Sequence, residues 1–188
     1  GIAGIIKDFK AEEYGMDKPF IRKQDLFTQY GVAAAYQAMK QSGLVSQGEG
    51  QNIDPFRLGV YFGSGIGGFA TQYREIAKMI EDPSSQWISP LFIPTMISNI
   101  AAGHIAIMHH AEGPCLDIVT ACATSTNAMG EAFRAIRNGY ADAIITGGCE
   151  NATIPIGIVG FANAKALSRA TDPKYASLPF NANRAGFV

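Results

Sequence analysis

The chain has 188 residues, of which 47% are hydrophobic and 16% are charged, as expected for one globular domain and not for a disordered chain. Fifteen Lys and Arg against sixteen Asp and Glu leave a net charge of −1, which disfavours a nucleic-acid binder. No apolar run reaches the roughly 18 residues of a membrane helix, so no membrane association is expected. The three cysteines have neither disulfide-framework nor zinc-site spacing, and no signal peptide is recognisable, which predicts a cytoplasmic protein with reduced thiols.

The first part of the chain predicts a helix, a strand and a second helix. Apolar residues recur at three- and four-residue steps from Gln24 to Ser42, and Gly43 is placed to end that helix. Residues 47–55 are polar and form a loop. Residues 57–62 then predict a buried strand, which runs through a Gly-rich turn into a helix over residues 69–80.

The second part continues the alternation. An apolar helix is expected after Pro94, which suits a first helical position. The expected helices cover residues 95–108, 123–138 and 155–167, and the expected strands cover residues 116–120 and 141–146. Strands that alternate with helices predict an α/β layered domain with a largely parallel sheet.

The Gly-rich turn, Gly63-Ser64-Gly65-Ile66-Gly67-Gly68, has glycines at the spacing of a dinucleotide-binding turn. However, no acidic residue ends a following strand about 20 residues later, and no Lys-Ser/Thr pair follows the glycines. We therefore interpret this segment as a tight turn or pocket wall in preference to a nucleotide site.

Cys122 lies between a predicted strand and a predicted helix, among small residues. A sharp turn there would project the thiol into a cleft, and a helix N-terminus favours the thiolate. The backbone N–H groups could also stabilise an oxyanion. A buried structural cysteine is the alternative, and this alternative is preferred for Cys115 and Cys149. His104, His109 and His110 lie in or at the end of an apolar helix, and a metal site or a thiol partner among them is disfavoured.

Several spaced motifs together resemble the β-ketoacyl-acyl carrier protein synthases, most closely the elongating type II enzymes of bacterial fatty acid synthesis. They are Gly63–Gly68, Val119-Thr120-Ala121-Cys122-Ala123-Thr124-Ser125, Ile144–Glu150 and Arg184-Ala185-Gly186-Phe187-Val188, with further agreement at residues 89–94, 99–104 and 155–168. Ala185 departs from the family, in which an acidic residue is usual at this place.

The resemblance implies a thiolase-like fold, layered α/β/α/β/α, of which residues 1–188 would be most of the N-terminal half. It implies that Cys122 accepts an acyl chain, that its amide forms half of the oxyanion hole, and that a decarboxylative Claisen condensation with malonyl-carrier protein follows. It places Ile66 near the acyl pocket and residues 89–110 beside the pocket and the dimer interface. It implies an acyl carrier protein as partner, a homodimer paired through residues 116–119, and no cofactor beyond the carrier's phosphopantetheine.

The resemblance also implies that parts of the catalytic machinery lie elsewhere. The family's two decarboxylation histidines and a supporting Lys come later in its chain, and its first strand comes before the position of Gly1. We therefore expect this segment alone to lack condensation activity. Two alternatives stay open: a polyketide-type ketosynthase, and a non-catalytic chain-length-controlling partner subunit, although such partners typically lack the cysteine.

Overall fold

The computed structural model describes residues 2–84 and 87–188, which form two compact units. We call Lys10–Asn151 the sheet unit, and the described part of Gly1–Phe9 together with Ala152–Val188 the small unit. Over the described residues, no helix is long and apolar enough to cross a membrane.

The sheet unit is built on a three-stranded, fully parallel sheet, as the sequence predicts. Its strands, in the order β2-β1-β3, are β1 (Leu58–Gly63), β2 (Cys115–Leu116) and β3 (Ala143–Gly148). The central strand β1 is buried along its whole length. It pairs with β3 from Leu58 opposite Ala143 to Gly63 opposite Gly148, so these two strands end at the same level.

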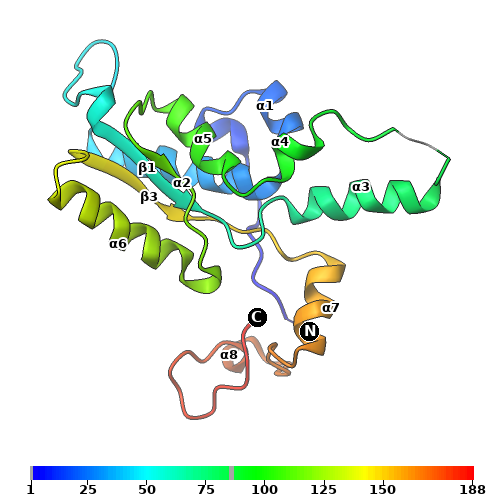
Figure 1. The fold of residues 1–188 in the computed structure, drawn as a ribbon. Helices are drawn as coiled ribbons and strands as arrows, with labels where there is room; N and C mark the ends of the chain where they lie inside the picture. The colour runs from blue at the N-terminus through cyan, green and yellow to red at the C-terminus, as the bar shows by residue number, and fades with distance from the viewer. Residues whose placement is uncertain (1, 85–86) are drawn as a thin grey trace. The chain divides into compact units, whose positions relative to one another are not determined.

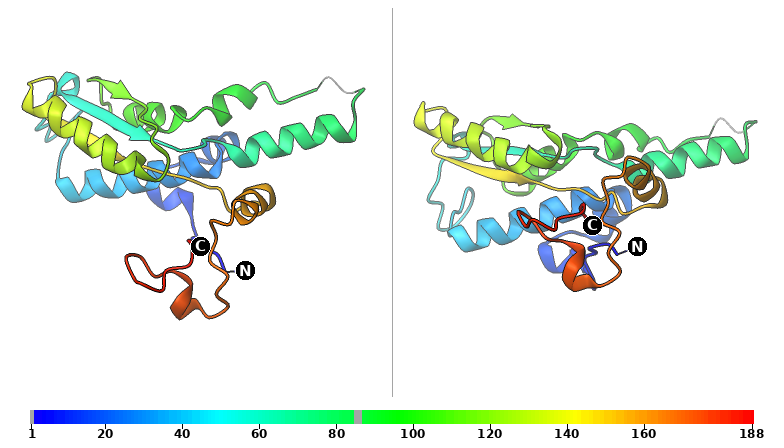
Figure 2. Two further views of the ribbon diagram at one scale, coloured as in Figure 1. Left: turned by 60° about the horizontal axis from the view of Figure 1, so that its bottom comes forward. Right: turned by 90° about the horizontal axis from the view of Figure 1, so that it is seen from below.

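Helices cover both faces of the sheet. Helix α6 (Thr124–Arg137) packs on one face, while α2 (Leu26–Ser42) and α5 (Ile100–Met108) pack on the other, as Figures 1 and 2 show. The buried core between these layers includes Phe27, Val32, Leu58, Val60, Phe62, Ala101, Ile105, Ala128 and Ile145. The predicted end of α2 is confirmed, because Gly43 takes the left-handed conformation (φ 70°) that only glycine adopts readily.

The remaining elements connect or flank these layers. Helix α3 (Phe69–Glu81) extends away from the sheet in Figure 1. The sheet unit also contains α1 (Lys18–Lys23), α4 (Phe92–Met96) and the short 3-10 turns η1 (Ala11–Tyr14), η2 (Pro55–Arg57) and η3 (Ala121–Ala123). The small unit contains α7 (Pro155–Asn163) and α8 (Pro173–Ala176).

Three predicted elements are wrong in extent. The helix expected over residues 95–108 is two helices, because Ile97 is extended (ψ 141°) and the Met96 carbonyl accepts from the Gly68 N–H at 2.9 Å. The strand expected over residues 116–120 has ladder pairing only at Cys115–Leu116. The helix expected to reach residue 167 ends at Asn163, and the chain then turns back through Lys165 at φ 57°.

In the small unit, two sequence motifs that carry the resemblance pair with each other. The Ser168 N–H donates to the Phe187 carbonyl at 2.8 Å, and the Phe187 N–H donates to the Ala166 carbonyl at 3.0 Å. A Cβ on Gly186 (φ 138°) would lie 2.4 Å from the Ser168 nitrogen. Gly186 is therefore required for this close backbone approach.

Asp25 caps α2 and also binds the start of α3. Removal of its side chain is expected to lower the free energy of unfolding by about 2–4 kcal/mol. The buried carboxylate accepts from the Phe27 N–H at 3.3 Å and from the Thr71 N–H and hydroxyl at 2.9 and 2.7 Å. An Asp25→Ala substitution leaves the Thr71 donors, which are buried, without an acceptor. Chemical denaturation of the protein that carries this chain measures the loss.

Asp17 is the matched control for this prediction, since it caps α1 through the Phe20 N–H but is exposed. Asp17→Ala is expected to cost about 1 kcal/mol or less. Equal losses at the two positions would contradict the argument, because the difference rests on the contact between Asp25 and Thr71.

Candidate active site

The carboxyl ends of the parallel strands converge at one edge of the sheet. Gly63 ends β1 and leads into the Gly-rich turn, and Gly148 ends β3 opposite it. The chain after β2 runs along the same edge to the start of α6, where Cys122 lies. In open parallel sheets, ligands bind outside this edge, which makes it the candidate location of the active site.

The turn that carries Cys122 is closed by its own hydrogen bonds. The Ala123 N–H donates to the Thr120 carbonyl at 3.0 Å, and the Thr120 N–H donates to the Thr124 hydroxyl at 3.0 Å. Ala121 takes a left-handed conformation (φ 50°), which costs about 1 kcal/mol for a residue with a side chain. Cys122 is exposed and is the middle residue of η3, two positions before Thr124, the first residue of α6. The sequence places Cys122 correctly at the start of the helix, although the strand before it ends earlier than predicted.

The Gly-rich turn is packed against backbone on two sides. A Cβ on Gly63 would lie 1.9 Å from the Ile118 carbonyl oxygen, and one on Gly68 would lie 2.6 Å from the Thr95 carbonyl oxygen. These glycines therefore allow the turn to lie directly against neighbouring backbone, where a side chain would not fit. This agrees with the interpretation as a tight turn.

Glu150, two residues after the end of β3, holds this turn. Its Oε1 accepts from the Ser64 hydroxyl and its Oε2 accepts from the Ile66 N–H, both at 3.1 Å. Although part of Glu150 is exposed, burial raises the pKa of its carboxyl, and the hydrogen bonds from Ser64 and Ile66 act in the opposite direction.

The Gly-rich turn and the Cys122 turn are neighbours. A Cβ on Gly65 would lie 3.7 Å from the Ala121 Cα, and the next residue, Ile66, has a side chain that is 37% exposed. The structure thus brings Ile66 and Cys122 onto adjacent turns. Glu150 is a member of this site that the residue pattern did not predict. The available signal was an acidic residue directly after a strand that ends in Gly-Gly.

The other cysteines and the histidines lie in different surroundings. Burial raises the pKa of the Cys149 thiol and of the Cys115 thiol, which disfavours the thiolate at both positions. His104 packs edge-on against Phe20 with ring centroids 4.8 Å apart, and burial lowers its pKa. Across residues 2–84 and 87–188, no cluster of three or more His, Cys, Asp or Glu side chains could hold a metal ion.

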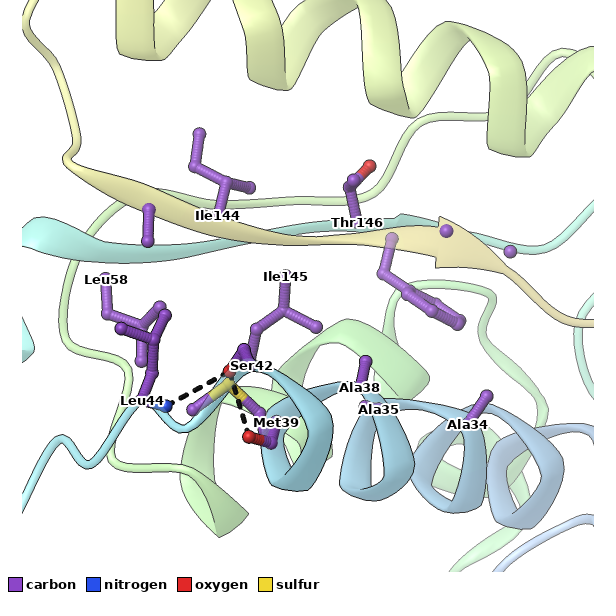
Figure 3. A pocket seen from close by; sticks show the side chains of 14 residues that line it. Ala34, Ala35, Ala38, Met39, Ser42, Leu44, Leu58, Ile144, Ile145 and Thr146 are labelled. Carbon is purple, nitrogen blue, oxygen red and sulfur yellow. Dashed lines mark hydrogen bonds between the residues drawn. The ribbon is translucent and has the colours of Figure 1, made fainter.

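A groove of about 350 Å³ runs between β3 and α2 (Figure 3). Ile145 points into it from the sheet, and Ala34, Ala38 and Met39 line it from the helix, while Ile144 and Thr146 point toward α6. This groove is apolar and lined by neither Cys122 nor Ile66. The groove is therefore separate from the candidate active site at the carboxyl ends of the strands.

Comparison with known proteins identifies the family. The family described as Beta-ketoacyl synthase, N-terminal domain, matches residues 2–188. The chain belongs to the β-ketoacyl synthase family. The resemblance seen in the sequence motifs is confirmed by this match, which extends over nearly all of the chain.

Curated relatives agree with this β-ketoacyl synthase assignment. The chain is 44% identical over 187 residues to 3-oxoacyl-[acyl-carrier-protein] synthase 2 of Vibrio cholerae, and 42% identical over 188 residues to the protein of that name from Staphylococcus aureus. These alignments cover 99% and 100% of this chain but 44% of each relative. The chain therefore spans less than half the length of these relatives.

Solved structures share the fold. A β-ketoacyl synthase from Burkholderia phymatum matches with a TM-score of 0.73 at 24% identity, covering 90% of this chain and 41% of that one. A structure described as a type II PKS acyl-carrier protein in complex with its ketosynthase bound to the hexaketide matches with a TM-score of 0.75 at 22% identity, covering 87% and 45%. The predicted α/β fold of the N-terminal half of a ketosynthase is confirmed.

Proposed function

We propose that the protein carrying this chain is a 3-oxoacyl-acyl carrier protein synthase of fatty acid elongation, with Cys122 as its nucleophile. The observation that carries the proposal is an exposed cysteine on the turn that leads into α6, next to the Gly-rich turn, in a member of the β-ketoacyl synthase family. The names of the relatives at 42–44% identity support fatty acid synthesis over polyketide synthesis.

In the proposed reaction the Cys122 thiolate attacks the thioester carbonyl of an acyl chain carried on phosphopantetheine. Backbone N–H groups at the start of α6 stabilise the oxyanion as it forms. The carrier's sulfur leaves and takes up a proton, so the acyl chain is now bound to Cys122. Ala121 and Ala123, the residues on either side, are small enough to leave the sulfur accessible.

The second half-reaction forms the carbon–carbon bond. Malonyl-carrier protein loses CO₂, and the resulting carbanion attacks the thioester carbonyl on Cys122. The bond to sulfur breaks, the thiolate is restored, and the product is a β-ketoacyl chain two carbons longer. We propose that histidines outside residues 1–188 promote the decarboxylation, because His104 is part of α5 and His109 and His110 directly follow it, so none of the three belongs to the segments that form the strand edge with Cys122.

The proposal includes an acyl carrier protein as partner, a cytoplasmic homodimer, and an acyl pocket that has Ile66 in its wall. It also treats residues 1–188 as part of an N-terminal synthase domain. The edge position of β3 supports a further strand there, since among the described residues β3 pairs only with β1.

The test uses the protein that carries this chain with acyl-carrier protein and malonyl-carrier protein. Without malonyl-carrier protein, peptide mapping by mass spectrometry is expected to find the acyl group on the Cys122 peptide and not on those of Cys115 or Cys149. With it, the expected product is a β-ketoacyl chain extended by two carbons. No adduct on Cys122 would contradict the proposal and favour a non-catalytic subunit, and repeated unreduced extensions would indicate a polyketide-type enzyme.

A further inference from the structure

The position of Ile66 depends on side chains outside its own segment. Four glycines, Gly63, Gly65, Gly67 and Gly68, surround it, and Gly67 is in the left-handed region at φ 76°. Glycine-rich backbone has more conformational freedom than any other, so local preference alone does not hold such a turn in one shape. Hydrogen bonds must supply the constraint.

Two side chains provide these hydrogen bonds. The Glu150 carboxylate accepts from the Ile66 N–H at 3.1 Å, and the Ser64 hydroxyl accepts from the Gly67 N–H at 3.0 Å. Ser64 in turn donates to Glu150 at 3.1 Å and is only 1% exposed. Two consecutive N–H groups of the turn, those of Ile66 and Gly67, are thus bound through one carboxylate and one hydroxyl, and the carboxylate follows the end of β3.

This arrangement connects the turn to the nucleophile. Glu150 follows Gly148 and Cys149, and the Cys149 N–H continues the sheet by donating to the Gly63 carbonyl at 3.0 Å. The Glu150 carboxylate is therefore anchored to the same strand ends that border the Cys122 turn. A Cβ on Gly65 would meet Glu150 Oε2 at 2.8 Å and the Ala121 Cα at 3.7 Å, so the carboxylate and the nucleophile's turn both lie close to Gly65.

We propose that Glu150 is a positioning residue that holds Ile66 at a fixed place beside Cys122 and thereby sets the length of acyl chain that the site accepts. This inference rests on the proposed function, since it takes Cys122 as the acylated residue. Glu150 acts through the backbone of Ile66. Its removal changes which acyl chains are accepted and leaves the reactivity of the thiol unchanged.

The test compares Glu150→Ala with Glu150→Gln in the protein that carries this chain. The readout is the ratio of Cys122 acylation rates for a long and a short saturated acyl-carrier protein. We expect Glu150→Ala to change this ratio at least about fivefold, as for the loss of hydrogen bonds to a charged group. Glu150→Gln keeps an acceptor for the Ile66 N–H and is expected to restore most of the wild-type ratio. Glu13→Ala, at an exposed glutamate on η1, is the control and should leave the ratio unchanged.

Two further measurements separate positioning from general damage. Alkylation of Cys122 by iodoacetamide is expected to stay within about twofold of the wild-type rate in Glu150→Ala. Hydrogen exchange of the peptide covering residues 63–70 is expected to become faster in the same variant. Should Glu150→Ala fail to fold, Ser64→Ala, which removes the hydroxyl but leaves the contact between Glu150 and Ile66, is expected to change the ratio in the same direction by a smaller factor.

An unchanged rate ratio in Glu150→Ala, with wild-type acylation intact, would overturn this inference alone. An equal fall for both chain lengths together with slower alkylation would also overturn it, because that is the result of a merely structural role. A wild-type protein that forms no adduct on Cys122 would overturn the proposed function and this inference with it.

Discussion

Replacing Cys122 with Ala is expected to lower acyl transfer by at least about a thousandfold, the usual scale for removing a nucleophile. The variant lacks the sulfur that would hold the acyl chain, so intact-protein mass spectrometry should find no acyl adduct after incubation with acyl-carrier protein. Because Cys122 is exposed, its truncation creates no buried cavity, and the thermal unfolding midpoint is expected to stay within about 2 °C of the wild type.

Cys115→Ala is the matched control for that experiment. Cys115 is also free and, although part of the residue is exposed, burial of its thiol and the nearby Asp117 raise its pKa. Acylation of this variant is expected to stay within about threefold of the wild type, the range for substitutions outside a site. Retained acylation of Cys122→Ala, or its loss in Cys115→Ala, would contradict the assignment of the nucleophile.

Gly63→Ala is expected to be the most destabilising of the substitutions considered, at about 4 kcal/mol or more. The added Cβ would lie 1.9 Å from the Ile118 carbonyl oxygen and 2.8 Å from the Thr124 Cγ2. Gly63 is part of the buried strand β1, which is paired on both sides, so it cannot move to relieve the contact. The segment that leads to Cys122 must shift instead. The expected result is a large loss of soluble protein, with slower Cys122 alkylation in whatever remains folded.

Gly103→Ala in α5 provides the comparison, since a Cβ there would meet no other atom within 4 Å. Alanine is the better helix former by about 0.5–1 kcal/mol, so this variant should be as stable as the wild type or slightly more so. Denaturant titration of both variants distinguishes the two cases. A Gly63→Ala protein of wild-type stability would show that the Ile118 segment can move away from β1 at little cost.

The sequence predicts much of the framework because the relevant signals are local. The period of the apolar residues identifies α2, α3 and α6, and Gly43 marks the end of α2 through its left-handed conformation. The place of Cys122 at the start of a helix follows from the same patterns. The family resemblance can also be recognised from the sequence, because it depends on which residues occur in which order and not on their contacts.

Other features were decided only when segments distant in the chain came together. The apolar pattern of residues 95–108 fits one helix, and nothing in it reveals that the Met96 carbonyl accepts from the Gly68 N–H. Likewise, β-branched residues after Leu116 favour a strand, yet the chain there passes over Gly63 without ladder pairing.

The candidate site shows the same division. The sequence alone determined the parallel α/β class, the cysteine at the start of a helix and the Gly-rich turn, since periodicity and residue type carry that information. Only the tertiary structure decided that Glu150 holds Ile66, because the two residues are 84 positions apart and meet through a backbone N–H that every residue type except proline possesses. Such a contact cannot be predicted from the residue pattern. It exists because parallel pairing of β1 with β3 brings both strand ends to the same edge of the sheet.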